Sequence, residues 1–217
     1  MIFFKQTTQI FCPLYLMNRP NKILIFDFDS TLSNQNLFSL FGSNVHNIEQ
    51  FYKNDATKRN FEITYFNEFD KMKALFSILV KKYNFRICIA SFGYKHMIDR
   101  FIELSYGYDL IRKDDIIGTN GLTKNPNDRR RSSIDPNYAV SFPFCYNESG
   151  ICKNHIITHF VQKYGTDDVI FFDDDRKNIA QAKHICKCVW INPLGSLTKD
   201  LVVDAINESI DNGRYRS

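Results

Sequence analysis

The 217-residue sequence has no long apolar run, little excess charge of one sign and no regular cysteine spacing. No stretch approaches the ~20 consecutive apolar residues that span a bilayer, so we expect no membrane-spanning helix and no membrane partner. The formal net charge of +4 is small beside 28 basic and 24 acidic residues, and it favours neither nucleic acid nor an anionic surface. Charge alone identifies no partner: nucleic acid stays possible but is not indicated, and the oligomeric state is open.

The six cysteines have neither the paired spacing of a structural zinc site nor the pattern of a disulfide framework. A chain of this length buries a substantial core without covalent staples, so we expect reduced thiols and a cytoplasmic location. The apolar segment 1–17 carries only Lys5 and no small-x-small cleavage site, and we interpret it as a strand or packing arm. The alternative is a secretory or organellar targeting signal.

Short apolar strands alternate with amphipathic helices along most of the chain. This alternation is typical of the α/β class and predicts a Rossmann-like, doubly wound parallel sheet covered by helices on both faces. Two segments, at about 33–66 and 107–152, lack a sustained period and are expected to be irregular insertions in a single catalytic domain spanning 1–217. The expected strands are 23–28, 85–91, 169–172 and 188–191, and the expected helices are 67–83, 94–106, 153–164, 176–184 and 197–210.

Polar side chains follow three of these strands. The apolar run I-L-I-F ends in D-F-D-S-T, which contains Asp27 and Asp29; the strand 85–91 ends in Ser91, and 169–172 runs into Asp173, Asp174 and Asp175. Ligands of parallel sheets collect beyond the carboxyl ends of the strands, so we expect these residues to meet at one edge.

Clustered carboxylates need a positive partner. The period of two in an extended chain points Asp27 and Asp29 to the same side, where two charges ~4 Å apart repel by ~4 kcal/mol at an effective dielectric of 20. Carboxylate oxygens without a Cys/His set call for a hard cation, and Mg²⁺ fits better than Ca²⁺. With Mg²⁺ in place, one carboxylate can attack phosphorus and the other can donate a proton.

The motif order extends this interpretation. D-F-D-S-T at 27–31, then Ser91, then a lysine at a helix start, then F-F-D-D-D-R-K-N at 171–178 resembles the four-motif signature of the haloacid dehalogenase (HAD) superfamily phosphatases. The chain is most similar to the small magnesium-dependent acid phosphatases with a minimal cap. The resemblance covers about residues 23–192 and implies a HAD-like fold and hydrolysis of phosphomonoesters.

The resemblance also implies roles for individual residues. Asp27 would become phosphorylated, and Asp29 would protonate the leaving oxygen and then activate water. Thr31 and Ser91 would donate hydrogen bonds, and Lys153 would neutralise the nucleophile and the phosphoryl oxygens.

The same resemblance implies a Mg²⁺ site. Asp27, the main-chain carbonyl of Asp29, and Asp174 with Asp173 beside it would hold the ion, and Asn178 would orient these ligands. Which of Asp173 and Asp174 is the main ligand stays open, and Asp175 is interpreted as a helix N-terminal acid.

Two kinds of alternative remain. Lys163 and Lys177 lie close enough in sequence to compete with Lys153 for its role. The substrate, a phosphorylated small molecule in the leading hypothesis, is a phosphoprotein or a nucleic acid 3′-phosphate in the second. In the third, the fold is a catalytically idle scaffold.

Overall fold

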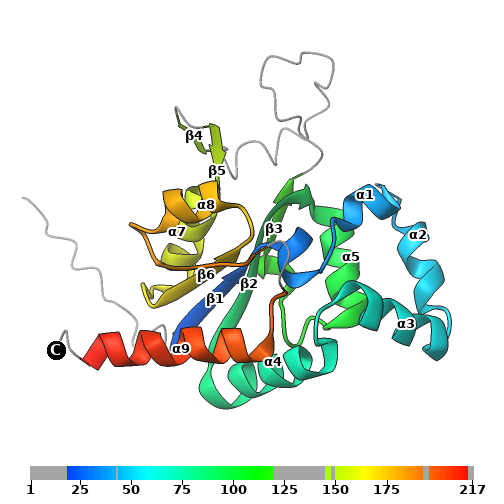
Figure 1. Cartoon of the computed structure of the whole chain (residues 1–217), viewed down its shortest axis with the longest axis horizontal. Helices are drawn as coiled ribbons and strands as arrows, with labels where there is room; N and C mark the ends of the chain where they lie inside the picture. Colours follow the sequence, from blue (N-terminus) through cyan, green and yellow to red (C-terminus); the bar gives the residue numbers. More distant parts are fainter. Residues whose placement is uncertain (1–18, 43, 120–144, 148–149, 193–195, 215–217) are drawn as a thin grey trace, which may run out of the picture.

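The centre of the molecule is a five-stranded sheet in the order β3-β2-β1-β6-β7, in which all neighbouring strands are parallel (Figure 1). The computed structural model describes residues 19–42, 44–119, 145–147, 150–192 and 196–214. The chain builds from β1 toward one edge and then returns to build the other edge through β6, so the strand order reverses between β1 and β6. This is the doubly wound α/β arrangement, and the predicted fold class is confirmed. The strands are β1 (Lys22–Phe26), β2 (Phe85–Tyr94), β3 (Ile116–Thr119), β6 (Val169–Asp173) and β7 (Lys187–Trp190).

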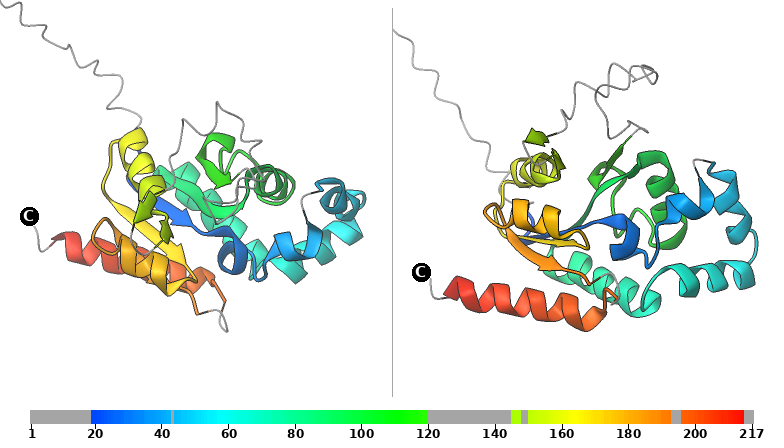
Figure 2. Two further views of the ribbon diagram at one scale, coloured as in Figure 1. Left: turned by 90° about the horizontal axis from the view of Figure 1, so that it is seen from above. Right: turned by 45° about the horizontal axis from the view of Figure 1, so that its top comes forward.

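Strand β1 separates two hydrophobic cores. Its continuous apolar run is buried on both faces, as expected for the centre of a parallel sheet. Leu24 and Phe26 face one core, whereas Ile23 and Ile25 face the other. Figure 2 shows the helices divided between the two faces. The first core is covered by α4 (Phe69–Tyr83), α5 (Lys95–Ser105) and α9 (Lys199–Arg214), and the second by α7 (Asn154–Tyr164) and α8 (Arg176–Ala182).

The segment 33–66 is helical, so the expectation of an irregular insertion there was wrong. Aromatic packing supplies the order that the sequence period does not indicate: the Phe61 ring stacks on Phe101 of α5 at 5.7 Å and contacts Phe41 at the same centroid distance. The side chain of Asn54 accepts a hydrogen bond of 2.9 Å from the Thr57 N–H and so begins the longest helix of this segment. The elements are α1 (Leu37–Phe41), α2 (His46–Glu49), η3 (Gln50–Tyr52) and α3 (Asp55–Tyr65).

The segment 107–152 also contains regular structure. It holds η4 (Lys113–Asp115), strand β3, and a two-stranded antiparallel sheet of β4 (Cys145–Asn147) and β5 (Gly150–Cys152). Strand β3 was not predicted because its four residues, I-I-G-T, are too short to show a period. Residues 120–144 of this segment and the N-terminal 1–17 lie outside the described residues. Among the described helices, none has the length and hydropathy needed to cross a bilayer.

Candidate active site

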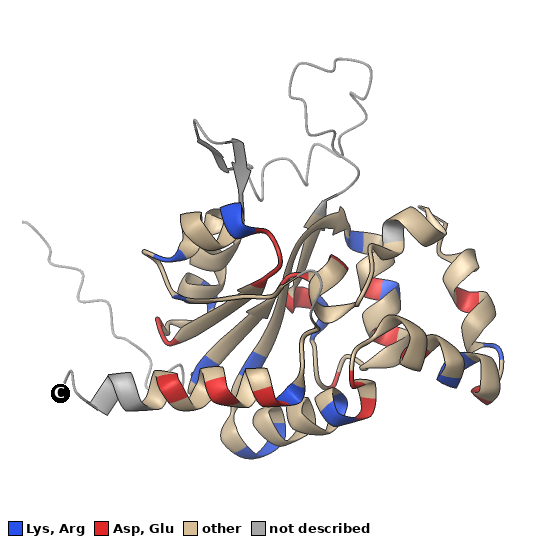
Figure 3. Cartoon of the chain, in the orientation of Figure 1, with Lys and Arg blue, Asp and Glu red and all other residues tan. Residues whose placement is uncertain are grey.

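A carboxylate cluster lies where the strand order reverses. Asp27 directly follows β1, and Asp173 ends the neighbouring strand β6. Phe26 is paired with Phe172, and the Asp27 N–H donates to the Phe172 carbonyl at 2.9 Å. The two strands therefore end side by side at the same edge of the sheet. Oxygens of Asp27, Asp173 and Asp174 lie within 4.8 Å of one another. Figure 3 shows acidic positions gathered at these strand ends, as the strand-end rule predicts.

Lys153 neutralises two members of this cluster. It directly precedes α7, and its side chain is only 1% exposed. Its Nζ lies 2.6 Å from Asp27 Oδ1 and 2.8 Å from Asp173 Oδ2. Of the competing lysines, Lys163 instead pairs with Asp115 at 2.7 Å, and Lys177 is exposed. The structure therefore places Lys153, and not its competitors, at the cluster.

Asp173 is fully buried and its oxygens are occupied. Besides Lys153, it accepts hydrogen bonds from Asn178 Nδ2, 3.1 Å from each carboxylate oxygen, and from the Asp175 N–H at 2.7 Å. Asn178, expected to orient the acidic ligands, thus holds Asp173. These contacts make Asp173 a support for the lysine ammonium.

The other two consecutive acids differ in environment. Asp174 is partly exposed, and its Oδ1 lies 3.5 Å from Thr31 Oγ1, a long contact. Asp175 accepts a hydrogen bond of 2.8 Å from the Lys177 N–H and caps α8. The three consecutive acids therefore differ in their contacts. Asp173 is paired with Lys153, Asp175 caps α8, and the carboxylate of Asp174 is partly exposed at the rim.

Asp29 is not one of the three acids of this cluster. The strand ends at Phe26, and the chain enters a wide turn, η2 (Phe28–Leu32), within which Asp29 itself keeps an extended backbone, with φ −70° and ψ 132°. Asp29 Oδ1 instead accepts a hydrogen bond of 2.8 Å from the Leu37 N–H at the start of α1. The acid that crowds Asp27 is Asp173, and the alignment of Asp29 with Asp27 stays a prediction.

Gly93 lies close to both Asp29 and Ser91, and the sequence analysis did not identify this glycine as part of the site. A Cβ at this position would lie 3.1 Å from Asp29 Oδ2 and 3.2 Å from Ser91 Oγ. The Gly93 N–H also donates to Ser91 Oγ at 3.0 Å, which leaves the serine O–H free to donate elsewhere. A glycine within the terminal S-F-G-Y of a strand is the signal of close approach that could have revealed it.

Burial sets the protonation behaviour of the site. It raises the pKa of Asp27 to about 7, an effect that Lys153 opposes and Asp173 reinforces. Burial and the neighbouring Asp173 also raise the pKa of Asp174. Burial by itself would lower the pKa of Lys153, but Asp27 and Asp173 outweigh it and the pKa is raised. The cluster thus holds three carboxylates and one ammonium, which contacts two of them, so carboxylates outnumber cations.

The donor set fits a hard divalent cation. Asp27, Asp173 and Asp174 offer only oxygen, and their excess negative charge is what such an ion offsets. Mg²⁺ binds through one or two carboxylates and keeps water or substrate oxygens as its other ligands, which suits a cluster with one partly open member.

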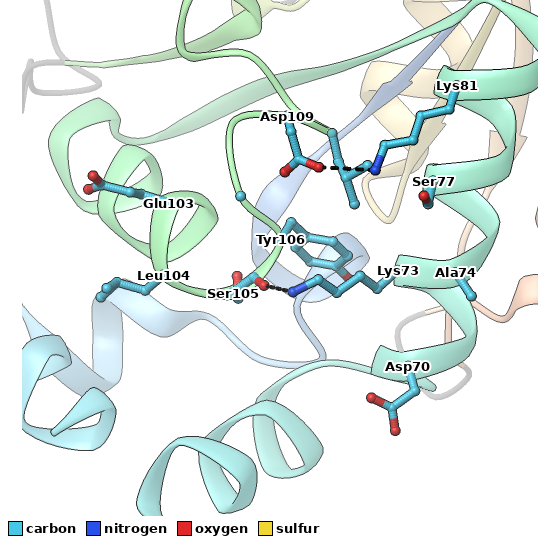
Figure 4. Close-up of a pocket in the computed structure, with 12 residues that line it drawn as sticks. Asp70, Lys73, Ala74, Ser77, Lys81, Glu103, Leu104, Ser105, Tyr106 and Asp109 are labelled. Atoms are coloured by element: carbon cyan, nitrogen blue, oxygen red, sulfur yellow. Dashed lines mark hydrogen bonds and ion pairs between the residues drawn. The ribbon is translucent and has the colours of Figure 1, made fainter. Parts of the chain in front are cut away.

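A separate groove of about 440 Å³ lies between α4 and α5 (Figure 4). Its cations already have partners, since Lys81 pairs with Asp109 at 3.4 Å and Lys73 donates to the Ser105 carbonyl. None of the predicted site residues lines it. The groove gives no support to a second active site.

Comparisons with known proteins give low similarity throughout. No protein-family model matches the chain, and no curated protein does. Among solved structures, the HAD domain of effector protein Lem4 from Legionella pneumophila, an inactive mutant, is 14% identical, with a TM-score of 0.48 over 81% of this chain and 87% of that chain.

Two further structures are similar at the same level. A phosphoserine phosphohydrolase-like protein from Francisella tularensis is 16% identical, with a TM-score of 0.39 over 75% of this chain and 82% of that chain. A haloacid dehalogenase-like hydrolase from Streptococcus pneumoniae is 11% identical, with a TM-score of 0.43 over 90% and 98%. Likenesses this weak assign neither family nor activity, and the HAD resemblance stays a prediction.

Proposed function

We propose that this chain is a Mg²⁺-dependent phosphomonoesterase that works through an aspartyl-phosphate on Asp27, as the HAD resemblance implies. The observation that carries the proposal is the buried Asp27–Lys153–Asp173 arrangement beside the partly open Asp174. Clustering of like charges is costly, and a binding scaffold has no need to maintain it.

The reaction would proceed in two displacements at phosphorus. An Asp27 oxygen attacks the phosphorus, the ester P–O bond breaks, and the leaving oxygen takes the proton of Asp29. Water then attacks the aspartyl-phosphate and gives its proton to Asp29, so that inorganic phosphate leaves and Asp27 is restored. Lys153 offsets the charge on the attacking carboxylate, and the free O–H of Ser91 donates to a phosphoryl oxygen.

The proposed Mg²⁺ ligands are Asp27, Asp174 and the main-chain carbonyl of Asp29. Bound Mg²⁺ would supply positive charge against the phosphoryl oxygens and the nucleophile. Asp173 acts through Lys153 instead, because its oxygens are already occupied by the ammonium, an amide and a backbone N–H. Thr31 supports Asp174, the member it contacts.

Hydrolysis of p-nitrophenyl phosphate tests the proposal. We expect turnover with Mg²⁺, loss of turnover with EDTA, and recovery when Mg²⁺ is restored. No hydrolysis of this ester, of phosphopeptides, of sugar phosphates or of 3′-phosphorylated oligonucleotides would instead support the idle scaffold.

Two adjacent variants sharpen this test. Asp174→Asn is expected to raise the Mg²⁺ concentration needed for half-maximal activity at least about tenfold, because it removes a proposed ligand. Asp175→Asn is the matched control: asparagine also caps helices, so the Mg²⁺ requirement and the stability should barely change. Equal effects of the two substitutions would refute the assignment of Asp174.

Stabilisation by Mg²⁺ should grow with pH. Because the folded pKa of Asp27 is about 7, above its unfolded value, the stability it contributes is complete below about pH 4 and is lost as the pH rises to about 7. A cation that binds the ionised carboxylate removes this penalty. We therefore expect Mg²⁺ to raise the melting temperature more at about pH 8 than at about pH 5. An increment that does not change with pH would contradict metal binding at Asp27.

A further inference from the structure

Arg176 is a cation that the proposed chemistry does not use. It is exposed and begins α8, directly after three acidic residues. Its guanidinium carbon nevertheless lies 4.0 Å from the centroid of the Trp190 ring, in a cation–π stack. Within the described part of the chain, the guanidinium has no ion pair and no hydrogen bond. The ring thus fixes the direction of the cation without neutralising it.

The stack is tied to the proposed active site. Trp190 ends β7 and is paired with Asp173 of β6, and its Nε1 donates to the Asp174 carbonyl at 2.9 Å. Strands β1, β6 and β7 lie side by side, so at ~4.8 Å per strand Trp190 is about 10 Å along the rim from Asp27. Arg176 is two residues from Asp174, a separation of at most ~7 Å along the chain. The Trp190 ring therefore links the guanidinium to Asp174, at the rim of the proposed site.

A guanidinium held in this way suits an anion. Its planar donors match phosphate and carboxylate groups, and a side chain already ordered by stacking loses less entropy when it binds. Lys177 next to it is also exposed, but among the described residues no aromatic ring lies over its ammonium. The neighbouring lysine is therefore a natural control.

We propose that Arg176 binds a second anionic group of the substrate, a phosphate or a carboxylate a few bonds from the scissile phosphate. The inference rests on the proposed function and narrows the substrate class to phosphomonoesters that carry a further negative charge. The second anion could belong to a small metabolite or to the backbone of a 3′-phosphorylated nucleic acid, since the recognition chemistry is the same.

Matched substrates test this role. In 3-phosphoglycerate a carboxylate replaces the terminal CH₂OH of glycerol 3-phosphate. A 3′-phosphorylated dinucleotide with a phosphodiester linkage differs from its analogue with an uncharged methylphosphonate linkage by the charge of one backbone phosphate. Wild type should favour the doubly anionic member of at least one pair, and which pair it is identifies the source of the anion. Arg176→Gln should reduce that preference in kcat/KM at least about tenfold, mainly through KM, and Arg176→Lys should reduce it less. Lys177→Gln should keep the preference.

The proposal is overturned if no pair shows a preference, or if Arg176→Gln leaves the preference unchanged. It is also overturned if Lys177→Gln acts as strongly as Arg176→Gln.

Calorimetry on an Asp27→Asn background separates this proposal from the proposed chemistry. With Mg²⁺ present, 3-phosphoglycerate or the dinucleotide should bind the Asp27→Asn protein at least about tenfold tighter than the Asp27→Asn/Arg176→Gln protein. If wild type hydrolyses no ester but the two Asp27→Asn proteins still show this difference in affinity, the result supports the role of Arg176 and contradicts the phosphatase proposal. Hydrolysis without any binding difference would support the phosphatase and defeat the role of Arg176.

Discussion

Replacing Asp27 with Asn is expected to lower kcat for p-nitrophenyl phosphate at least about 10³-fold, because the amide cannot form the acyl phosphate. The fold should survive. The pKa of Asp27 is raised to about 7, so ionising this carboxyl costs stability at neutral pH, and a neutral amide of nearly the same shape avoids that cost. Without Mg²⁺, we expect Asp27→Asn to melt at the same temperature as wild type or higher.

A surface control makes the result specific. Asp114 is exposed in η4, and Asp114→Asn should leave both kcat and the melting temperature unchanged. Activity within about tenfold of wild type in Asp27→Asn would remove Asp27 from the role of nucleophile. Loss of activity together with a large fall in melting temperature would show that the residue acts on folding instead.

Replacing Lys153 with Met is expected to reduce both stability and activity. Removing one partner of a buried ion pair typically costs ~3–5 kcal/mol, and here a single ammonium serves both Asp27 and Asp173. Activity should fall at least about 10²-fold, because the proposed nucleophile Asp27 and the phosphoryl oxygens would lose their neutralising charge. Urea unfolding and steady-state kinetics on the same preparation measure the two effects. The exposed Lys183 gives the control Lys183→Met, which should change neither.

The stability loss should depend on pH. Lys153 lowers the pKa of Asp27, so without it that pKa rises above about 7 and the folded state resists ionisation more strongly. A raised folded pKa means stability that is present at low pH and lost as the pH rises. The deficit of Lys153→Met should therefore be larger at about pH 8 than at about pH 5.

A double variant isolates the interaction. Adding Asp27→Asn to Lys153→Met removes one unpaired carboxylate and should restore part of the stability while activity stays absent. A deficit that is equal at both pH values, or that Asp27→Asn does not reduce, would contradict a charge-based role for Lys153.

The sequence predicted the fold class and the gathering of acidic residues at one edge of the sheet because both depend on short-range patterns. Apolar runs that end in acids mark strand ends, and in a parallel sheet those ends meet at one edge. Lys153 was identified from motif order, and the structure places its ammonium on Asp27 and Asp173. Gly165 ends α7 in the left-handed region, with a φ of 63°, as glycine commonly does after a helix.

What the sequence did not predict depends on contacts between distant segments. The helices of 33–66 are held by rings such as Phe61 against Phe101, which lie forty residues apart. Asp173, Asp174 and Asp175 differ in burial and in their contacts with Lys153. No spacing rule in the sequence distinguishes three identical neighbours. The stack of Arg176 on Trp190 joins a helix start to an edge strand, a contact that no local pattern indicates.

Strand β6, which pairs with one edge of β1, lies more than a hundred residues later in the chain, so during synthesis β1 is made long before this partner. Until residues 169–173 pair with it, β1 is an outer strand whose five buried residues have an unpaired backbone edge, and such edges invite association with other chains. The lysine that neutralises Asp27 also arrives only with the second half of the winding. A nascent or clipped polypeptide that stops before residue 153 would therefore lack this lysine and be prone to aggregation, so we expect chaperones to bind it and proteases to degrade it.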